Sequence, residues 1–318
     1  MSESVPGPLL LVVDEPAGSV VSETTSAHLR HFPRRLLGGR FARWRDHLAG
    51  HMLPLPASGG YRCDTWDQLI SLHRPPEVLL FLATPTQGLI PADAPLAAAT
   101  ASFAPNHRDT IGASEAEAQE WWQALHESDA LGAVRGGLSG LVGSFPHATV
   151  LAALRTETLR AVHADVWEAR KHSQDPERFV LLAPQSHGPI GIGPSQIGVS
   201  AAFHALLGGA LHDQPARLLH HFAHRLGSDH LRASVLQRKT KEMACDLPPT
   251  RNTPKKRPAT RRKLGGKTLE KFVVGELSRD PLLSLSGLRR SLNDSGATAA
   301  DAELRTLHDR HSLPLFAG

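Results

Sequence analysis

The chain has 318 residues, of which 41% are hydrophobic and 21% are charged. This length corresponds to about two domains, and the composition excludes a wholly disordered protein. The formal net charge of +4 is distributed unevenly. Residues 238–271 carry twelve basic and three acidic side chains, whereas residues 1–237 have a net charge of −4 and residues 272–318 of −1. This distribution excludes a uniformly basic coat protein and singles out one short segment.

The longest apolar runs, at residues 9–13 and 78–83, are far shorter than the roughly 20 residues of a membrane-spanning helix. We therefore expect no membrane partner. The first residues lack the basic region of a secretion signal, and two cysteines are too few for a disulfide scaffold or a cysteine-rich zinc site. We expect a reducing compartment: the cytoplasm of a bacterium, or the nucleus if the host is eukaryotic or the protein is viral.

Three short apolar runs in the first 237 residues predict buried strands. They are Leu9–Asp14, Val78–Ala83 and Phe179–Ala183, each bounded by proline or glycine. Helical patterns separate them along the chain. Residues 1–237 are therefore expected to form one mixed domain of the α/β or α+β class.

Several helices of this domain are predicted from local signals. Ser114 and Glu117 form a capping box before an apolar run. Apolar residues recur at helical spacing over Ala148–His172, which predicts one long helix. Pro215 follows Asp213 at a position typical of a first helical turn, and an apolar stripe comes after it: Leu218, Leu219, Phe222 and Leu226.

The C-terminal quarter has a different composition. Residues 246–267 are rich in proline, glycine and basic residues, and such a segment is typical of a flexible linker. Beyond it, leucines at helical spacing predict a small module of three helices. The expected organisation is a mixed domain at 1–237, a helix end and basic linker at 238–267, and a helical module at 268–318.

The basic linker is the strongest functional signal. On an extended chain its charges stay solvated, where they can neutralise phosphates and release condensed counterions. We therefore expect contacts to DNA or RNA from a cluster of six residues: Lys255, Lys256, Arg257, Arg261, Arg262 and Lys263. Two alternatives remain open. The same composition is typical of nuclear-import peptides, and it also suits a charged spacer without a partner.

The C-terminal module is compatible with a helix-turn-helix, because a short glycine-containing turn precedes its last helix. Arg289 and Arg290 are then candidates for secondary phosphate contacts. Asp301 and Glu303 at the start of the last helix disfavour DNA reading, since acidic groups repel phosphates. A three-helix bundle that docks on another protein fits equally well.

Residues 28–47 contain six arginines interleaved with Phe32, Phe41 and Trp44. Guanidinium groups beside aromatic planes suit single-stranded nucleic acid. An amphipathic helix that buries its aromatic face explains the pattern better, because the domain needs these side chains for its core.

A histidine group on the helix after Pro215 raises the question of metal binding. His220 and His224 lie one helical turn apart, with His221 beside them. The HExxH pattern of metalloproteases is absent, so a solvated polar face is the expected role. Protonation near pH 6 would make this face positive.

Polar residues at the predicted strand ends are the only candidates for chemistry. In α/β sheets, reactions take place at the carboxyl ends of strands. The acidic pair Asp14 and Glu15 is of the type that holds Mg²⁺ in nucleases and phosphotransferases. The other strand-end residues are Thr84, Thr86, Gln87, Gln185, Ser186 and His187. The glycine-rich stretch at 187–198 matches neither a P-loop nor a dinucleotide fingerprint.

The sequence thus favours a non-enzymatic nucleic-acid-binding protein, expected as a subunit of a nucleoprotein assembly such as that of a plasmid, virus or other mobile element. Two other hypotheses remain. One is an α/β metal-dependent nuclease or phosphotransferase that uses the strand-end acids. The other is a protein-interaction subunit with a charged spacer. The patterns assign no catalytic residue, metal ligand or cofactor.

Overall fold

The computed structural model describes residues 7–16, 27–33, 37–112, 114–127, 131–227, 230–245, 262–279, 285–294 and 297–311. The chain divides into two compact units, Met1–Pro248 and Pro249–Gly318. Within the described ranges, no helix combines the length and the apolar composition that a membrane crossing requires.

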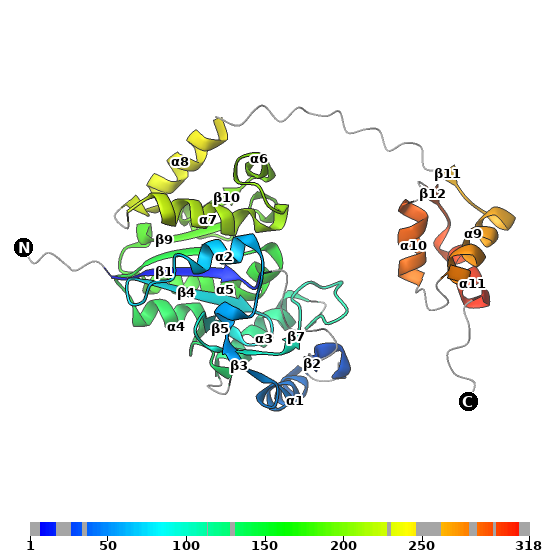
Figure 1. Ribbon diagram of the computed structural model, residues 1–318, viewed down its shortest axis with the longest axis horizontal. Coiled ribbons are helices and arrows are strands. Elements are labelled where there is room, and N and C mark those ends of the chain that lie inside the picture. The colour runs from blue at the N-terminus through cyan, green and yellow to red at the C-terminus, as the bar shows by residue number, and fades with distance from the viewer. Residues whose placement is uncertain are drawn as a thin grey trace, which may run out of the picture. The chain divides into compact units, whose positions relative to one another are not determined.

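A six-stranded sheet forms the centre of the first unit (Figure 1). Its spatial order is β10 (Gln196–Val199), β9 (Phe179–Pro184), β8 (Thr149–Ala153), β1 (Leu9–Asp14), β4 (Val78–Thr84) and β5 (Gly88–Pro91). The first five strands are parallel, and β5 pairs antiparallel with β4. The mixed strand and helix content confirms an α/β domain, and the three predicted strands are present as β1, β4 and β9.

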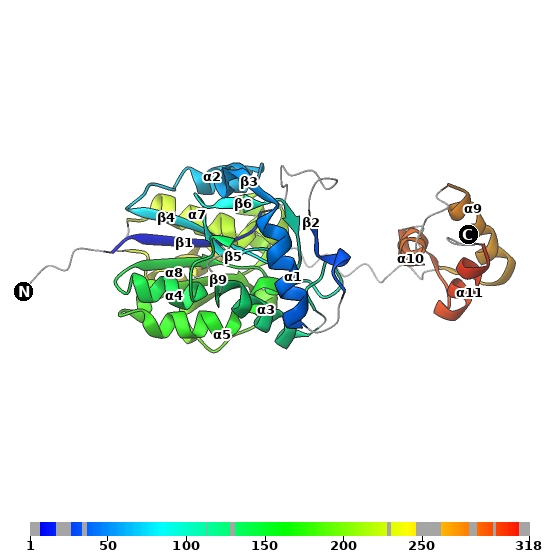
Figure 2. The ribbon, with the colours of Figure 1, turned by 90° about the horizontal axis from the view of Figure 1, so that it is seen from below.

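Helices cover both faces of this sheet (Figure 2). One face carries α1 (Leu37–Ala49), α3 (Glu115–Glu127), α4 (Gly137–Ser144) and α5 (Thr156–His172). The other carries α2 (Asp64–Ile70), α7 (Gln214–Arg225) and α8 (Ala233–Cys245). Along β1, Leu10 and Val12 belong to the first core, and Leu9, Leu11 and Val13 belong to the second. Because strand side chains alternate between faces, a strand buried on both sides needs a continuous apolar run.

Short elements complete the domain at its margins. Their bounds are β2 (Ala27–His28) paired with β7 (Ala99–Thr100), β3 (Met52–Pro56) paired with β6 (Pro95–Ala97), and α6 (His204–Leu207). The predicted capping box is present before α3: the Ser114 hydroxyl accepts the Glu117 N–H, and the Glu117 carboxylate accepts the Ser114 N–H. Pro215 is the second residue of α7, and the predicted leucine stripe of this helix is buried at Leu218 and Leu219.

The prediction of one long helix over Ala148–His172 is wrong at its beginning. Residues 149–153 form the buried strand β8, and α5 begins only at Thr156. Their apolar spacing also fits a helix, Ala152 and Ala153 favour helices, and neither glycine nor proline marks the boundary. In the folded chain, β8 pairs with β1 on one side and β9 on the other. These tertiary hydrogen bonds decide the conformation, which no local signal encodes.

The aromatic residues of the arginine-rich stretch belong to the core, as the amphipathic-helix interpretation predicts. Phe41 and Trp44 of α1 are buried, and Phe32 packs edge-on against Trp44 with ring centroids 5.5 Å apart. Arg40 is buried as well. Its guanidinium donates to three backbone carbonyls: Leu29, Thr110 and Ile111. This arginine therefore joins chain segments inside the domain and is not available to a nucleic acid.

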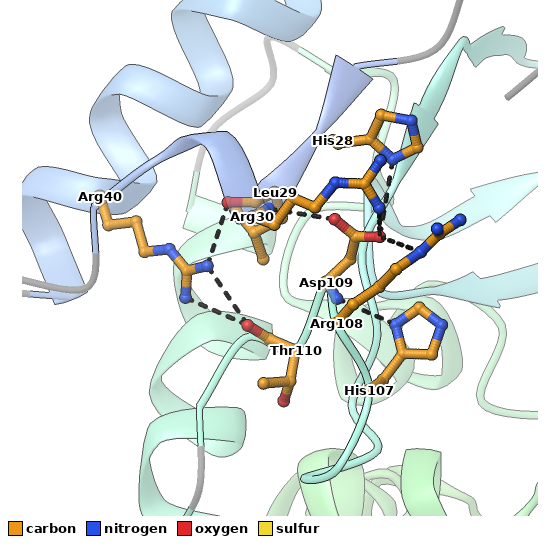
Figure 3. A network of polar contacts seen from close by, with 8 residues as sticks. All are labelled: His28, Leu29, Arg30, Arg40, His107, Arg108, Asp109 and Thr110. Carbon is orange, nitrogen blue, oxygen red and sulfur yellow. Dashed lines mark hydrogen bonds and ion pairs between the residues drawn. The ribbon is translucent and has the colours of Figure 1, made fainter. Parts of the chain in front are cut away.

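A buried carboxylate lies next to Arg40 (Figure 3). Asp109 is completely buried, and it accepts hydrogen bonds from the backbone N–H and the guanidinium of Arg30. Its Oδ2 also lies 3.5 Å from His28 Nδ1 and 3.6 Å from Arg108 Nε. The network connects residues 27–31 to residues 107–111, so its basic members have a structural role.

The second unit contains α9 (Gly266–Arg279), α10 (Leu285–Asp294) and α11 (Asp301–His311). They enclose a small core that includes Leu269, Val273, Leu288 and Leu304. The unit also has a short parallel pair, β11 (Arg262–Lys263) and β12 (Ala297–Thr298), which the sequence patterns do not predict. The domain boundaries at 237 and 267 and the helix-turn-helix character of the module stay predictions.

Candidate ligand site at the carboxyl edge of the sheet

The strand order creates one special position at the carboxyl edge. The strand that follows β1 in the parallel part of the sheet, β4, is one neighbour of β1. The chain later returns to form β8, the other neighbour of β1, and continues away from it with β9 and β10. The connections that leave the carboxyl ends of β1 and β8 therefore lead in opposite directions, and such a topological switch point has a crevice between the two strand ends. Asp14 and Glu15 at the end of β1 and Arg155 after β8 lie at this topological switch point.

Asp14 is bound to the start of α5. Its side chain is 8% exposed, its Oδ2 accepts the backbone N–H of Arg155, and the Arg155 Nε lies 3.5 Å away. Burial raises the pKa of Asp14, while Arg155 and the Thr158 hydroxyl act in the opposite direction. Oδ1 is buried without a hydrogen-bond partner of ordinary geometry among the described residues. The carboxylate of Asp14 therefore joins the end of β1 to the beginning of α5.

Glu15 has a different environment. Its Oε1 accepts a 3.0 Å hydrogen bond from the hydroxyl of Tyr61, which is the only tyrosine of the chain. Burial raises the pKa of Glu15 to about 7, although Tyr61 and Arg155 both lower it. Burial and the nearby carboxylate also raise the pKa of Tyr61 well above its usual value. Glu15 therefore exchanges its proton near neutral pH, which suits a general acid or base.

The two acids meet different partners. The Asp14 carboxylate contacts Arg155, whereas the Glu15 carboxylate accepts from Tyr61, as expected for consecutive residues at the end of a strand. The Arg155 guanidinium also donates to the backbone carbonyl of Glu15. Among the described residues, no group of three or more histidines, cysteines and acids is arranged to hold a metal ion. The metal-dependent nuclease stays a prediction.

A cleft of about 610 Å³ opens beside the switch point. Residues that follow β8, β9 and β10 line it, together with the first residues of α7; among them are Arg155, Glu157, Ser186, Ser200, His212 and Gln214. A small cavity of about 20 Å³, which is room for about one water molecule, lies beside Asp14, Glu15 and Trp66. Arg155, His212 and Pro215 line both spaces. The volume of the cleft is within the range of small-molecule sites.

The remaining strand-end candidates divide into two groups. Thr84, Thr86 and Gln87 are buried, and Gln87 bonds the backbone of Pro95, Ala97 and Leu131, so these residues hold a turn together. Gln185 and Ser186 line the cleft. His187 lies in the same turn, and burial lowers its pKa.

Two residues that line the cleft, Arg155 and Gln214, and the Glu15 partner Tyr61 have no functional signal in the sequence. Arg155 follows β8, which the helical pattern conceals. Tyr61 is notable only as the single tyrosine, and Gln214 belongs to a helix start that was predicted without any functional role. A strand assignment for residues 149–153 would have placed Arg155 next to Asp14, since parallel strand ends meet at one edge.

The structure describes only some of the residues that are predicted to contact phosphates. Lys255, Lys256, Arg257 and Arg261 lie outside the described residues. Arg262 and Lys263 form β11, and their side chains, like that of Arg290 in α10, are outside the described part of the structure. Arg289 is exposed and forms a 2.9 Å ion pair with Asp301 of α11. Such an exposed pair is weak and leaves Arg289 able to exchange partners.

The histidines of α7 are partly buried on the helix surface. His220 and His224 have ring centroids 5.5 Å apart. Burial lowers the pKa of His220 and His221, and neighbouring histidines and arginines lower it further. Protonation of these two residues therefore requires a lower pH than that of an ordinary exposed histidine.

Comparison of the chain with protein-family models, with curated proteins and with solved structures gives no match.

Proposed function

We propose that this protein binds nucleic acid through residues 238–271, as a non-catalytic subunit of a nucleoprotein assembly. The observation that carries the proposal is the net charge of +9 on this segment, between regions that are mildly acidic. The structure describes the first residues of this segment, which belong to α8. Arg238 and Lys241 are exposed there, and Glu242 is the single acidic residue of this helix. Counterion release makes such a segment bind polyanions with little sequence preference.

The proposal predicts a strong dependence on salt. Replacing Lys255, Lys256 and Arg257 with glutamine removes three potential phosphate contacts. We expect weaker binding to duplex DNA and a slope of log affinity against log salt that is less steep by up to about 3. Fluorescence anisotropy of the full chain at several salt concentrations, with labelled DNA and RNA of equal length, measures both quantities.

A matched variant controls for net charge. Arg43, Arg62 and Arg135 are exposed residues of the α/β domain, and their replacement by glutamine also removes three positive charges. This control should leave the salt slope unchanged. An equal effect of both variants, or no effect of either, contradicts the proposal. Retention of a protein partner but not of nucleic acid would instead favour the interaction subunit with a charged spacer.

A further inference from the structure

A short surface segment separates the small cavity at the end of β1 from the large cleft. Residues 208–213 connect α6 to α7 (Figure 1), and we call them the lid. Leu211 and His212 line the cleft, whereas His212 and Asp213 line the small cavity. A displacement of the lid therefore joins the two spaces and gives water access to the acids at the end of β1.

The lid is the least packed wall of the small cavity among the described residues. Residues 208–212 are exposed, and Leu211 has 61% of its surface in contact with solvent. The side-chain amide of Gln214 donates to two carbonyls of the lid. On the opposite wall, Tyr61 and Trp66 are only 3% and 1% exposed. Because segments with few buried apolar contacts open at the lowest cost, the lid is the wall that can move.

The small cavity concentrates acidic groups in a space with room for about one water molecule. Three carboxyl groups line it, and the guanidinium of Arg155 is the one permanent cation of the described lining. Glu15 and its neighbour on β1 cannot both be ionised there without loss of hydration. The charged and titratable groups around Glu15 come from every surrounding element: Asp14 on β1, Tyr61 before α2, Arg155 before α5, Glu157 on α5, and His212 and Asp213 on the lid.

The proton of Glu15 is linked to the position of the lid. Burial, with a smaller contribution from Asp14, raises the pKa of Glu15 to about 7 in the closed form. Contact with water returns the pKa toward the ordinary value of 4.5. The carboxyl group therefore binds its proton more tightly in the closed form, which loses stability relative to the open form as the pH rises from about 4.5 to about 7.

We propose that residues 208–213 are a pH-controlled lid, which closes over the neutral carboxyl group of Glu15 and opens when this group is ionised. The open lid joins the small cavity to the cleft of about 610 Å³ at the carboxyl edge of the sheet. The lid begins at Gly208 and Gly209, whose φ angles of +64° and +73° favour glycine. This device is independent of the proposed binding of nucleic acid, which depends on residues 238–271.

A single thiol on the wall of the small cavity measures the opening. The full chain with Cys63→Ala and Cys245→Ser carries Thr65→Cys, at a position that is 4% exposed and lines the cavity. Mass spectrometry follows its modification by methyl methanethiosulfonate at pH 5 and pH 8. Adding Glu15→Gln should slow the modification by at least about tenfold at pH 8 and by no more than about fivefold at pH 5. No effect, or the same effect at both pH values, overturns the proposal.

Two glycine variants test whether the moving part is the lid. Gly208→Ala strains the backbone of the closed lid and should speed the modification by about fivefold or more. Gly188→Ala is the matched control: its φ is +79°, and an added Cβ meets no atom within 4 Å at either glycine. It lies outside the lid and should leave the rate unchanged. An equal acceleration in both variants, or none in Gly208→Ala, overturns the proposal.

A thiol in the other core separates opening of the lid from unfolding of the whole domain. Ala118→Cys on α3, at a position that is 5% exposed, should react at least about tenfold more slowly than Thr65→Cys. Equal rates at the two positions overturn the proposal, because the cavity is then reached only by unfolding. If Thr65→Cys does not fold, Ala216→Cys on the α7 wall of the same cavity takes its place, with the same expected results.

Discussion

Replacing Glu15 with glutamine is expected to raise the free energy of unfolding at pH 8 by up to about 3 kcal/mol. The carboxyl group has a pKa of about 7 in the folded chain and 4.5 without the fold, so it binds its proton more tightly in the folded state. Stability therefore falls as the pH rises from about 4.5 to about 7, and the loss persists at higher pH. Glutamine is neutral throughout, keeps an acceptor for Tyr61, and avoids this loss.

Chemical denaturation at pH 5 and pH 8 measures the effect. The variant should gain most of its stability at pH 8 and little at pH 5, where Glu15 is protonated in the folded chain. Glu127→Gln, at an exposed position of α3, is the matched control and should change neither value by more than about 0.5 kcal/mol. In Tyr61→Phe, the fall in stability should extend to higher pH. The phenol donates to the ionised carboxylate, so its loss raises the pKa of Glu15 in the folded chain. The same pH dependence in Glu15→Gln and in the unmodified chain would contradict the assignment.

Replacing Asp109 with alanine should lower the free energy of unfolding by about 2–3 kcal/mol, because a buried backbone donor loses a charged acceptor while the part-exposed Arg30 and Arg108 stay in contact with solvent. The carboxylate has no exposed surface, and it serves both the backbone N–H and the guanidinium of Arg30 (Figure 3). Its removal leaves a buried donor and a cluster of positive charges without their common partner. Urea denaturation at pH 7 measures the loss.

Two variants separate the parts of this effect. Asp109→Asn keeps an acceptor for the Arg30 N–H but loses the charge, so we expect an intermediate loss. Asp46→Ala breaks the exposed pair with Arg45, whose atoms are 3.1 Å apart, and should change stability by less than about 0.5 kcal/mol. If Asp109→Ala were as stable as Asp46→Ala, the network would not hold residues 27–31 to residues 107–111.

The strands that are buried on both faces can be predicted from the amino-acid pattern. In β1, β4 and β9 every position except those at the ends must be apolar, because helices cover the sheet on both sides. A short continuous apolar run therefore predicts a strand that is buried on both faces. The segregation of positive charge into residues 238–271 is likewise visible from the sequence, since charge needs no structure to be counted.

The position of β8 and the lining of the cleft, in contrast, depend on tertiary contacts. The conformation of residues 149–153 is set by hydrogen bonds to β1 and β9, which come from distant parts of the chain. Asp14 and Glu15 are recognisable as a strand-end pair, but Tyr61 and Arg155 reach them through crossovers that no local pattern records. The strand order also places the pair at the switch point, and burial there gives Glu15 its pKa near neutrality. The two acidic residues are recognisable in the sequence, whereas their burial and their partners follow from the strand order.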